Sequence, residues 1–221
     1  MNKLTEMRAF FNDIALDYDK KIISKADADM EGKQLVASFI PQHAKSLINF
    51  GIGTGLELEA IFERFPEIDV TGLDISENML ELLKGKYASR NLHLYCKSYL
   101  DCDFGHIQYD VALSIKTLHH YCHDVKTALY KKIHACLNEN GVYIECDKMA
   151  STQAEENFHF AEYERMKQTQ GIHDNQAYHY DTPCTVPNQK KMLSAAGFSH
   201  VWEAWRKDSE RGLIVILAAR K

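Results

Sequence analysis

Residues 46–58 read SLINFGIGTGLEL, and the rest of the chain is organised around them. A short apolar run typical of a buried strand comes first, and apolar residues at helical spacing follow from Leu58 onward. Between the two lie Gly51, Gly53 and Gly55, which give the backbone the freedom to turn sharply. A strand that enters a helix through such a turn is a place where nucleotide-like ligands bind. The stretch therefore predicts a ligand site of this kind.

Beyond this stretch, strand and helix patterns alternate along the chain. Strands are predicted at 47–50, 68–73, 92–96, 109–115 and 142–146, and helices at 58–65, at 76–87 with Ser76 as N-cap, and from Asp124 to a stop at Asn140 and Gly141. Parallel neighbours in a sheet need crossover connections, which the intervening helices supply. The alternation therefore predicts an α/β fold, a three-layer Rossmann-like sheet with helices on both faces.

The two ends of the chain depart from that alternation. Residues 1–45 predict a helical cap, with one helix near 7–14, an aromatic and acidic turn at Tyr18 and Asp19, and a second helix at 30–39. Residues 187–221 predict a helix, which Thr185 or Asn188 opens, and then strands at 200–206 and 212–219. Because the link between these strands is short, we expect an antiparallel hairpin that ends the mostly parallel sheet in one reversed C-terminal strand.

The composition is that of one globular domain. The chain has 221 residues, of which 45% are hydrophobic, and a net charge of -5, so the total charge predicts no broad basic surface for nucleic acid. The six cysteines form no C-x-x-C pair, which favours a reducing compartment. The first residues show no secretory signal pattern, and no apolar stretch is long enough to span a bilayer. We therefore expect a cytoplasmic protein without a membrane partner.

The spacing of the glycines distinguishes two classes of ligand. The dinucleotide fingerprint G-x-G-x-x-G needs a third glycine where this chain has Leu56, so a nicotinamide-dependent reductase is disfavoured. Asp74 ends the second predicted strand, roughly 20 residues after the glycine turn. At that position, dinucleotide sites and sites for other nucleoside ligands both use an acidic residue to bind ribose hydroxyls. Asp74 therefore supports a nucleoside ligand without choosing between these two classes.

Several motifs, in order along the chain, resemble those of the class I S-adenosylmethionine-dependent methyltransferases, in particular small bacterial members related to the ubiquinone and menaquinone biosynthesis enzymes. The motifs are INFGIGTG at 48–55, GLDISENML at 72–80, CKSYLDCDF at 96–104, YDVALSIKTLHH at 109–120 and LNENGVYIECD at 137–147. FNDIALDYDK at 11–20 resembles the segment that covers the cofactor in this group. The resemblance spans essentially the whole chain and implies S-adenosylmethionine as cofactor.

The resemblance also implies which residues bind the cofactor. They are Gly51, Gly53 and Gly55 of the loop at the methionine part, Asp74 at the ribose hydroxyls, Ile75 and Met79 beside the adenine, Ser98 and Tyr99 at its other edge, Ile115 at the methionine amino group, and Tyr18 closing over the top. Two positions depart from the family pattern. Asn49 replaces an acidic residue and so adds no charge, and Ser98 replaces an aspartate of longer reach, whose contact Asp101 or Asp103 could supply.

The run LHHYCH at 118–123 lies, by the resemblance, beside the methyl group to be transferred. His119 and His120 are therefore candidate catalytic residues, either as a general base or by holding the acceptor, and the alternative is that they only fix the loop. The run also offers potential zinc ligands. Because no second cluster with matching ligand spacing appears in the sequence, we expect no metal site.

The stretch 150–186, after the fifth predicted strand of the core at 46–149, mixes aromatic and polar residues. It lies where open parallel sheets gather their ligand-side loops, so it predicts a lid over the acceptor, with Tyr178 to Tyr180 facing the pocket. A helix packed on the core is the alternative interpretation.

The predicted activity is methyl transfer to an O, N, S or C atom of a small molecule. The alternatives are an RNA-modifying methyltransferase and a non-catalytic module that binds S-adenosylmethionine. The sequence leaves the state of assembly open, as monomer or homodimer.

Overall fold

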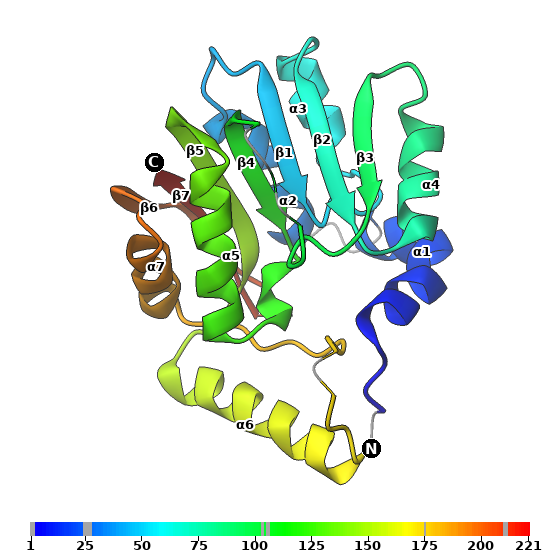
Figure 1. Ribbon diagram of the computed structural model, residues 1–221, viewed down its shortest axis with the longest axis vertical. Helices are drawn as coiled ribbons and strands as arrows, with labels where there is room; N and C mark the ends of the chain where they lie inside the picture. Colours follow the sequence, from blue (N-terminus) through cyan, green and yellow to red (C-terminus); the bar gives the residue numbers. More distant parts are fainter. Residues whose placement is uncertain (1–2, 24–27, 103, 105–106, 175, 210–211) are drawn as a thin grey trace.

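The computed structural model describes residues 3–23, 28–102, 104, 107–174, 176–209 and 212–221. Within them, seven strands form one sheet in the order β3-β2-β1-β4-β5-β7-β6 (Figure 1). The strands are β1 (Ser46–Phe50), β2 (Asp69–Asp74), β3 (Leu92–Cys96), β4 (Tyr109–Ile115), β5 (Leu137–Met149), β6 (His200–Ser209) and β7 (Gly212–Arg220). β1 to β5 pair in parallel, whereas β7 is antiparallel to β5. The predicted α/β class and the reversed C-terminal strand are confirmed.

Helices cover both faces of this sheet. They are α1 (Met7–Ile23), α2 (Ala28–Phe39), α3 (Leu58–Arg64), α4 (Glu77–Lys86), α5 (His123–Ala135), α6 (Gln153–Thr169) and α7 (Val186–Ala195), with a 3-10 turn η1 (Leu118–His120). One apolar core packs α5 and α7 on the sheet, and a second packs α2, α3 and α4 on it. α1 and α6 lie at the end of the sheet toward which β1 and β4 point (Figure 1). Among the described residues, no helix is long and apolar enough to cross a bilayer.

Three local predictions were wrong. Tyr18 and Asp19 lie inside α1, which continues to Ile23 instead of ending before a turn. α5 has Cys122 as its N-cap, not Asp124, and ends at Ala135. Residues 137–141 belong to β5, because Tyr109 pairs with Leu137 while Val111 pairs with Val142, so the pairing takes up the extra polar residues as an irregularity of the ladder.

The reversed strand is also not the edge of the sheet. β7 lies between β5 and β6, and β6, antiparallel to β7, forms the edge. The residues explain the order, since Leu213 to Ala219 are all buried whereas 200–208 are partly or fully exposed. A strand buried on both faces belongs inside a sheet, and a polar one belongs at its edge. The link within the predicted hairpin, at 210–211, lies outside the described residues.

A buried polar cluster holds α5 and α7 against β5. The Glu145 carboxylate is fully buried and accepts hydrogen bonds from Tyr130 Oη at 2.9 Å and from Gln189 Nε2 at 2.5 Å. Burial and the charge of Asp147 raise the pKa of Glu145 to about 7. Glu145 is therefore largely protonated in the folded protein at mildly acidic pH, where a carboxyl group in the unfolded chain is ionised.

We expect the variant Glu145→Gln to remove part of the pH dependence of stability. Between pH about 4.5 and about 7 the native protein holds a proton on Glu145 that the unfolded chain releases, so the free energy of unfolding falls as pH rises through this window, by on the order of 2–3 kcal/mol. Glutamine has no such proton. Urea unfolding at pH 5 and pH 7.5 should show a smaller difference for Glu145→Gln than for wild type, and the exposed Glu139→Gln serves as control. Equal differences in all three proteins would contradict this assignment.

Candidate functional site

A cavity lies at the carboxyl ends of β1, β2 and β4, and its empty space, open solvent included, is about 590 Å³. Ten of the predicted site residues line it, namely Tyr18, Gly51, Gly53, Gly55, Asp74, Ile75, Met79, Tyr99, Ile115 and His120. Asn49, Ser98 and His119 are not among its lining residues. The cavity sits beside the point where the strand order reverses, between β1 and β4, which is where open α/β sheets bind ligands.

The glycine turn brings bare backbone to this cavity. Gly51 has φ +74°, and a Cβ there would lie 2.5 Å from Thr117 Oγ1, so any side chain would collide with the end of β4. Gly53 has φ +53°, and a Cβ there would meet no heavy atom within 4 Å. The backbone at Gly53 therefore borders open space into which a ligand fits closely.

Asp74 fixes the loop from the neighbouring strand. Its Oδ2 accepts from the backbone N–H of Gly53 at 2.8 Å, and its Oδ1 accepts from the N–H of Ser76 at 2.9 Å. Burial raises the pKa of Asp74, and these backbone hydrogen bonds act against that rise. A carboxylate can accept about four hydrogen bonds. Asp74 therefore keeps acceptor capacity for a ligand while it holds the glycine turn.

Asn49 is fully buried behind the cavity and holds a second carboxylate. Its Nδ2 donates to Glu57 Oε1 at 2.6 Å, and Glu57 Oε2 lies 3.9 Å from Lys33 Nζ. Glu57 and Lys33 are buried, and both line the cavity. The sequence had suggested that Asn49 leaves this end of the site without a negative charge; Glu57 supplies one from the start of α3. Its position directly after the glycine turn was the signal available in the sequence.

Ser98 faces its own turn rather than the cavity. Its Oγ accepts from the backbone N–H of Leu100 at 3.2 Å. Asp101, one of its two predicted substitutes, is exposed and does not line the cavity, and Asp103 lies outside the described residues. Tyr99 does reach the site, where its hydroxyl shares a 2.8 Å hydrogen bond with Thr117 Oγ1.

Helix α1 covers the cavity and is attached to the loops beneath it. Asn12 Oδ1 accepts from Ser76 Oγ at 2.7 Å. Asp19 Oδ1 accepts from Thr54 Oγ1 at 2.5 Å, and Asp19 Oδ2 accepts from Lys86 Nζ at 2.8 Å. Tyr18 lines the cavity from this helix. The cover is therefore a helix that two of its own side chains, Asn12 and Asp19, attach to the loops beneath.

The two histidines of η1 have different surroundings. His119 Nδ1 lies 2.5 Å from Asp147 Oδ1; burial opposes a charge on the ring, but Asp147 and Asp181 raise its pKa above the usual value. His120 Nδ1 lies 3.1 Å from the carbonyl oxygen of Tyr180, and burial together with the nearby His119 holds its pKa well below the usual value. Of the two, only His120 lines the first cavity, and the Nδ1 of His119 contacts Asp147 of β5 instead.

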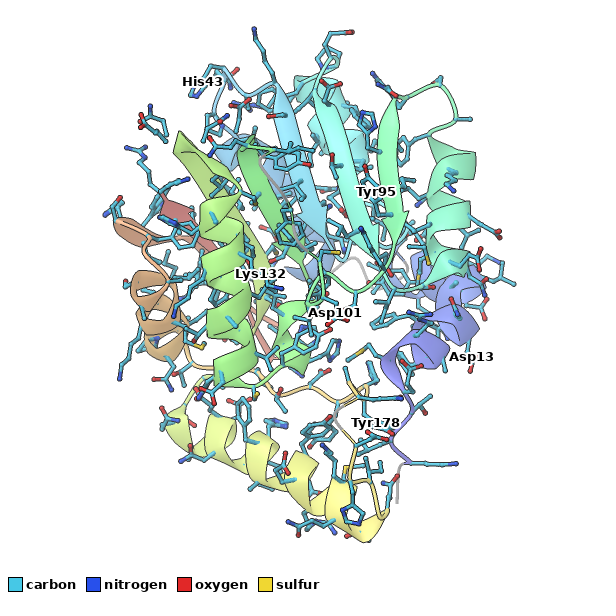
Figure 2. All side chains as sticks on the ribbon, in the orientation of Figure 1. Asp13, His43, Tyr95, Asp101, Lys132 and Tyr178 are labelled. Carbon is cyan, nitrogen blue, oxygen red and sulfur yellow. The ribbon has the colours of Figure 1, made fainter. Side chains whose placement is uncertain are left out.

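A second cavity lies beside Asp181, which contacts both histidines, and its empty space, open solvent included, is about 1480 Å³. Residues from the N-terminal segment, from α6 and from 179–181 line it, including Phe10, Tyr180 and Asp181. The predicted lid thus contains a helix and an extended segment. Tyr178 forms a β-bridge with Glu6 of the N-terminal segment (Figure 2). Its hydroxyl donates to Asp174 at 3.0 Å. Of the tyrosines predicted to face the acceptor, Tyr180 borders the cavity and Tyr178 does not.

Comparison with known proteins places the core among methyltransferases. Residues 47–141 match the family model described as a methyltransferase domain. The carboxy-S-adenosyl-L-methionine synthase of Campylobacter lari is 27% identical over 140 residues, which are 62% of this chain and 59% of that protein. A malonyl-[acyl-carrier protein] O-methyltransferase of Priestia megaterium is 29% identical over 126 residues, which are 56% of this chain and 45% of that protein. The chain thus spans about half the length of these relatives.

Among solved structures, the magnesium protoporphyrin IX methyltransferase of Synechocystis with bound S-adenosylmethionine has the same fold. The TM-score is 0.67 at 14% identity, over 97% of this chain and 94% of that one. At this identity the likeness concerns the fold.

We expect the variant Asp19→Ala to loosen α1 without unfolding the core. Asp19 joins α1 both to Thr54 of the glycine turn and to Lys86 of α4, and a lost side-chain hydrogen bond of this kind costs about 1 kcal/mol. Hydrogen exchange of the amides of residues 7–23 should become several-fold faster, while the exchange of β1 and β4 stays as in wild type. The exposed Asp13→Ala on the same helix is the control. Unchanged exchange in α1 would show that this attachment does not hold the helix.

Proposed function

Because the chain belongs to the class I S-adenosylmethionine-dependent methyltransferase family, we propose that it transfers a methyl group from S-adenosylmethionine to an O, N, S or C atom of a small molecule. One observation carries the proposal: the glycine turn, Asp74 and His120 line a single cavity at the carboxyl edge of the sheet. The second cavity, beside Asp181, supports a small acceptor that approaches from the lid.

The residues of the first cavity fit this cofactor. Asp74 has acceptor capacity for two ribose hydroxyls, and Ile75 and Met79 offer apolar surface to the adenine. Two buried charged residues complete the fit. Lys33 can pair with the carboxylate of the methionine end, and Glu57 can pair with its ammonium. We therefore assign to Asn49 the positioning of Glu57, in place of direct contact. An adenine contact by Ser98 stays a prediction.

The chain's task in the reaction is alignment, since S-adenosylmethionine brings a methyl group already activated by its sulfonium. α1, with Tyr18 facing inward, closes over the cofactor and excludes water. Ile115, at the end of β4, lines the side of the cavity that lies next to η1. His120, which borders the first cavity, orients the acceptor and helps to remove its proton where it carries one, and a direct role of His119 stays a prediction.

Finer expectations remain predictions of the sequence. They are the relation to the quinone-biosynthesis enzymes, a cytoplasmic location, the division into cap, core, lid and C-terminal hairpin at 45, 149 and 186, and the alternatives of an RNA acceptor or a purely cofactor-binding role. The test of the activity is transfer of labelled methyl groups from S-adenosylmethionine into an extract of small metabolites. In a parallel assay with total cellular RNA, label that enters nuclease-sensitive material while the metabolite extract stays unlabelled would replace the small acceptor with RNA.

We expect the variant Asp74→Ala to lose that transfer together with cofactor binding. The change removes the acceptor for the ribose and the two backbone hydrogen bonds that shape the loop, so the Kd for S-adenosylhomocysteine, measured by calorimetry, should rise at least about tenfold. Asp69→Ala, at the exposed opposite end of β2, should leave the Kd unchanged. A wild-type protein that binds neither S-adenosylmethionine nor S-adenosylhomocysteine would refute the proposed function.

We expect Glu57→Gln to affect only one half of the cofactor. The neutral amide keeps the shape but loses the charge that attracts the ammonium, so the Kd for S-adenosylhomocysteine should rise about tenfold. 5′-Methylthioadenosine contains the same nucleoside without the amino acid, and its Kd should not change. If both ligands bind more weakly by the same factor, Glu57 supports the loop and does not recognise the amino acid.

A further inference from the structure

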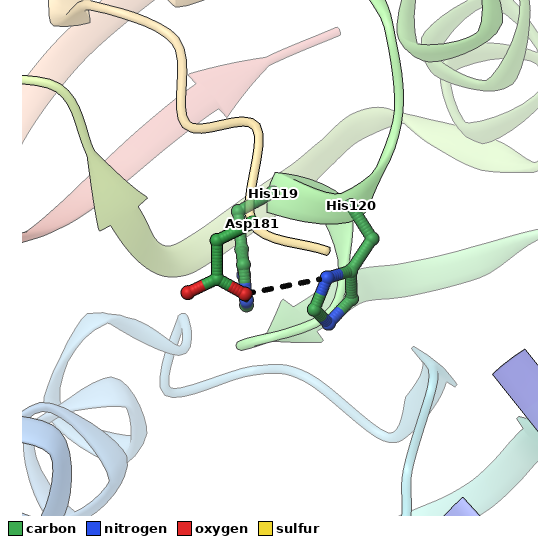
Figure 3. Close-up of side chains that lie close together, drawn as sticks. All are labelled: His119, His120 and Asp181. Carbon is green, nitrogen blue, oxygen red and sulfur yellow. Dashed lines mark ion pairs between the residues drawn. The ribbon is translucent and has the colours of Figure 1, made fainter. Parts of the chain in front are cut away.

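Three side chains that could each ligate a metal ion, from two segments distant in sequence, lie close together between the two cavities. His119 and His120 come from η1, and Asp181 comes from the segment that leads to α7 (Figure 3). Asp181 Oδ1 lies 3.4 Å from His119 Nε2 and 3.6 Å from His120 Nδ1. The two imidazoles are buried, and His120 borders the first cavity whereas Asp181 borders the second.

These separations are long for hydrogen bonds and suit a shared ion. Nitrogen and oxygen atoms joined by a good hydrogen bond lie about 2.7–3.2 Å apart. Two ligands of one tetrahedral ion, each about 2.1 Å from it, lie about 3.4 Å apart. Asp181 Oδ1 therefore stands in the relation to both rings that ligands of one ion have. The other oxygen, Oδ2, accepts from Lys148 Nζ at 3.0 Å, which leaves Oδ1 for the ion.

The surroundings hold the donors in place. Asp147 Oδ1 lies 2.5 Å from His119 Nδ1 and so orients Nε2 toward Asp181, and Asp147 Oδ2 accepts from the backbone N–H of Leu118 at 2.9 Å. A carboxylate on the far nitrogen of a histidine is the usual support of a metal-binding imidazole. Thr182 ties the second segment to the first, since its N–H donates to the carbonyl oxygen of His119 at 2.6 Å. These contacts hold His119 and the segment of Asp181 in place without an ion.

We propose that His119, His120 and Asp181 bind one divalent transition-metal ion of the zinc type, with Asp147 as the positioning residue of His119. Two imidazoles and one carboxylate form a common ligand set for such ions, and three protein ligands leave a position open. On binding, the ring proton of His120 moves from Nδ1 to Nε2, and Nδ1 exchanges its hydrogen bond to the carbonyl oxygen of Tyr180 for the ion. The site itself follows from geometry alone; its use rests on the proposed function, in which an acceptor oxygen or nitrogen takes the open position and loses its proton more readily there.

A second group, His123, Glu156 and Cys184, also lies within ligand distance but is already hydrogen-bonded. His123 Nε2 and Glu156 Oε1 are 2.8 Å apart, as in a normal hydrogen bond. Lys126 Nζ donates to Cys184 Sγ at 3.2 Å, so this sulfur is already a hydrogen-bond acceptor. This group gives a matched control within the same chain.

The test is titration of the full-length, metal-stripped protein with Zn²⁺ by calorimetry and with Co²⁺ by visible absorption. We expect one ion per chain. Asp181→Asn, which keeps the size of the side chain, and His120→Ala should each weaken binding at least about 100-fold, and Asp147→Asn about 10- to 100-fold. His123→Ala should bind as wild type does. Circular dichroism of each variant establishes that it is folded.

Two results would overturn the metal site: a folded wild type that binds no stoichiometric Zn²⁺, or binding that depends on His123 and not on Asp181 and His120. Titration of the same samples with S-adenosylhomocysteine separates this inference from the proposed function. A protein that binds S-adenosylhomocysteine but no Zn²⁺ contradicts the metal site alone. A protein that binds Zn²⁺ through Asp181 and His120 but no S-adenosylhomocysteine supports the metal site and contradicts the methyltransferase.

Discussion

The parallel pairing of β1 to β5 brings the carboxyl ends of these strands to one edge, and the whole candidate site depends on that constraint. The glycine turn follows β1, Asp74 ends β2, η1 follows β4, and Asp147 lies near the end of β5. No two of these features are close in sequence, yet hydrogen bonds join them in pairs, Asp74 to the glycine turn and Asp147 to η1. The sheet therefore does more than support the site; it determines which residues can meet there.

Local sequence patterns, which involve residues close together in the chain, predicted most of the helices and strands. The five core strands and Ser76 as the N-cap of α4 were expected from apolar periodicity and turn residues, and the structure has them. The errors fell where tertiary packing outweighs local preference. Asn140 and Gly141 usually end a helix, but here the pairing of β4 with Leu137 draws them into a strand. The exposed character of β6 put it at the edge, although β7 is the last strand in the chain.

The candidate site was predictable only in the half that carries a local motif. The glycines, Asp74 and their immediate neighbours line the cavity as expected. Partners that arrive from elsewhere in the chain could not be found, because neither spacing nor residue type marks them. Lys33 reaches Glu57 from α2, and Asp181 reaches the histidines from beyond the lid helix. The expectation of no metal site rested on adjacent histidines with no second cluster, and that test did not weigh a carboxylate as distant in sequence as Asp181.

Glu145 and Asp147 show how far surroundings decide the chemistry of one residue type. They are two residues apart on β5 and both fully buried, so side-chain alternation places them on the same face of the sheet. Burial and the charge of Asp147 raise the pKa of Glu145 to about 7, although hydrogen bonds from a tyrosine hydroxyl and a glutamine amide act against that rise. The charge and the ring nitrogen of His119, together with nearby lysines, hold the pKa of Asp147 far below the usual value, and backbone N–H groups also donate to this carboxylate. The first carboxyl group can therefore stay neutral and join α5 and α7 to the sheet. The second keeps its charge, and that charge is what orders η1 and faces His119 toward Asp181.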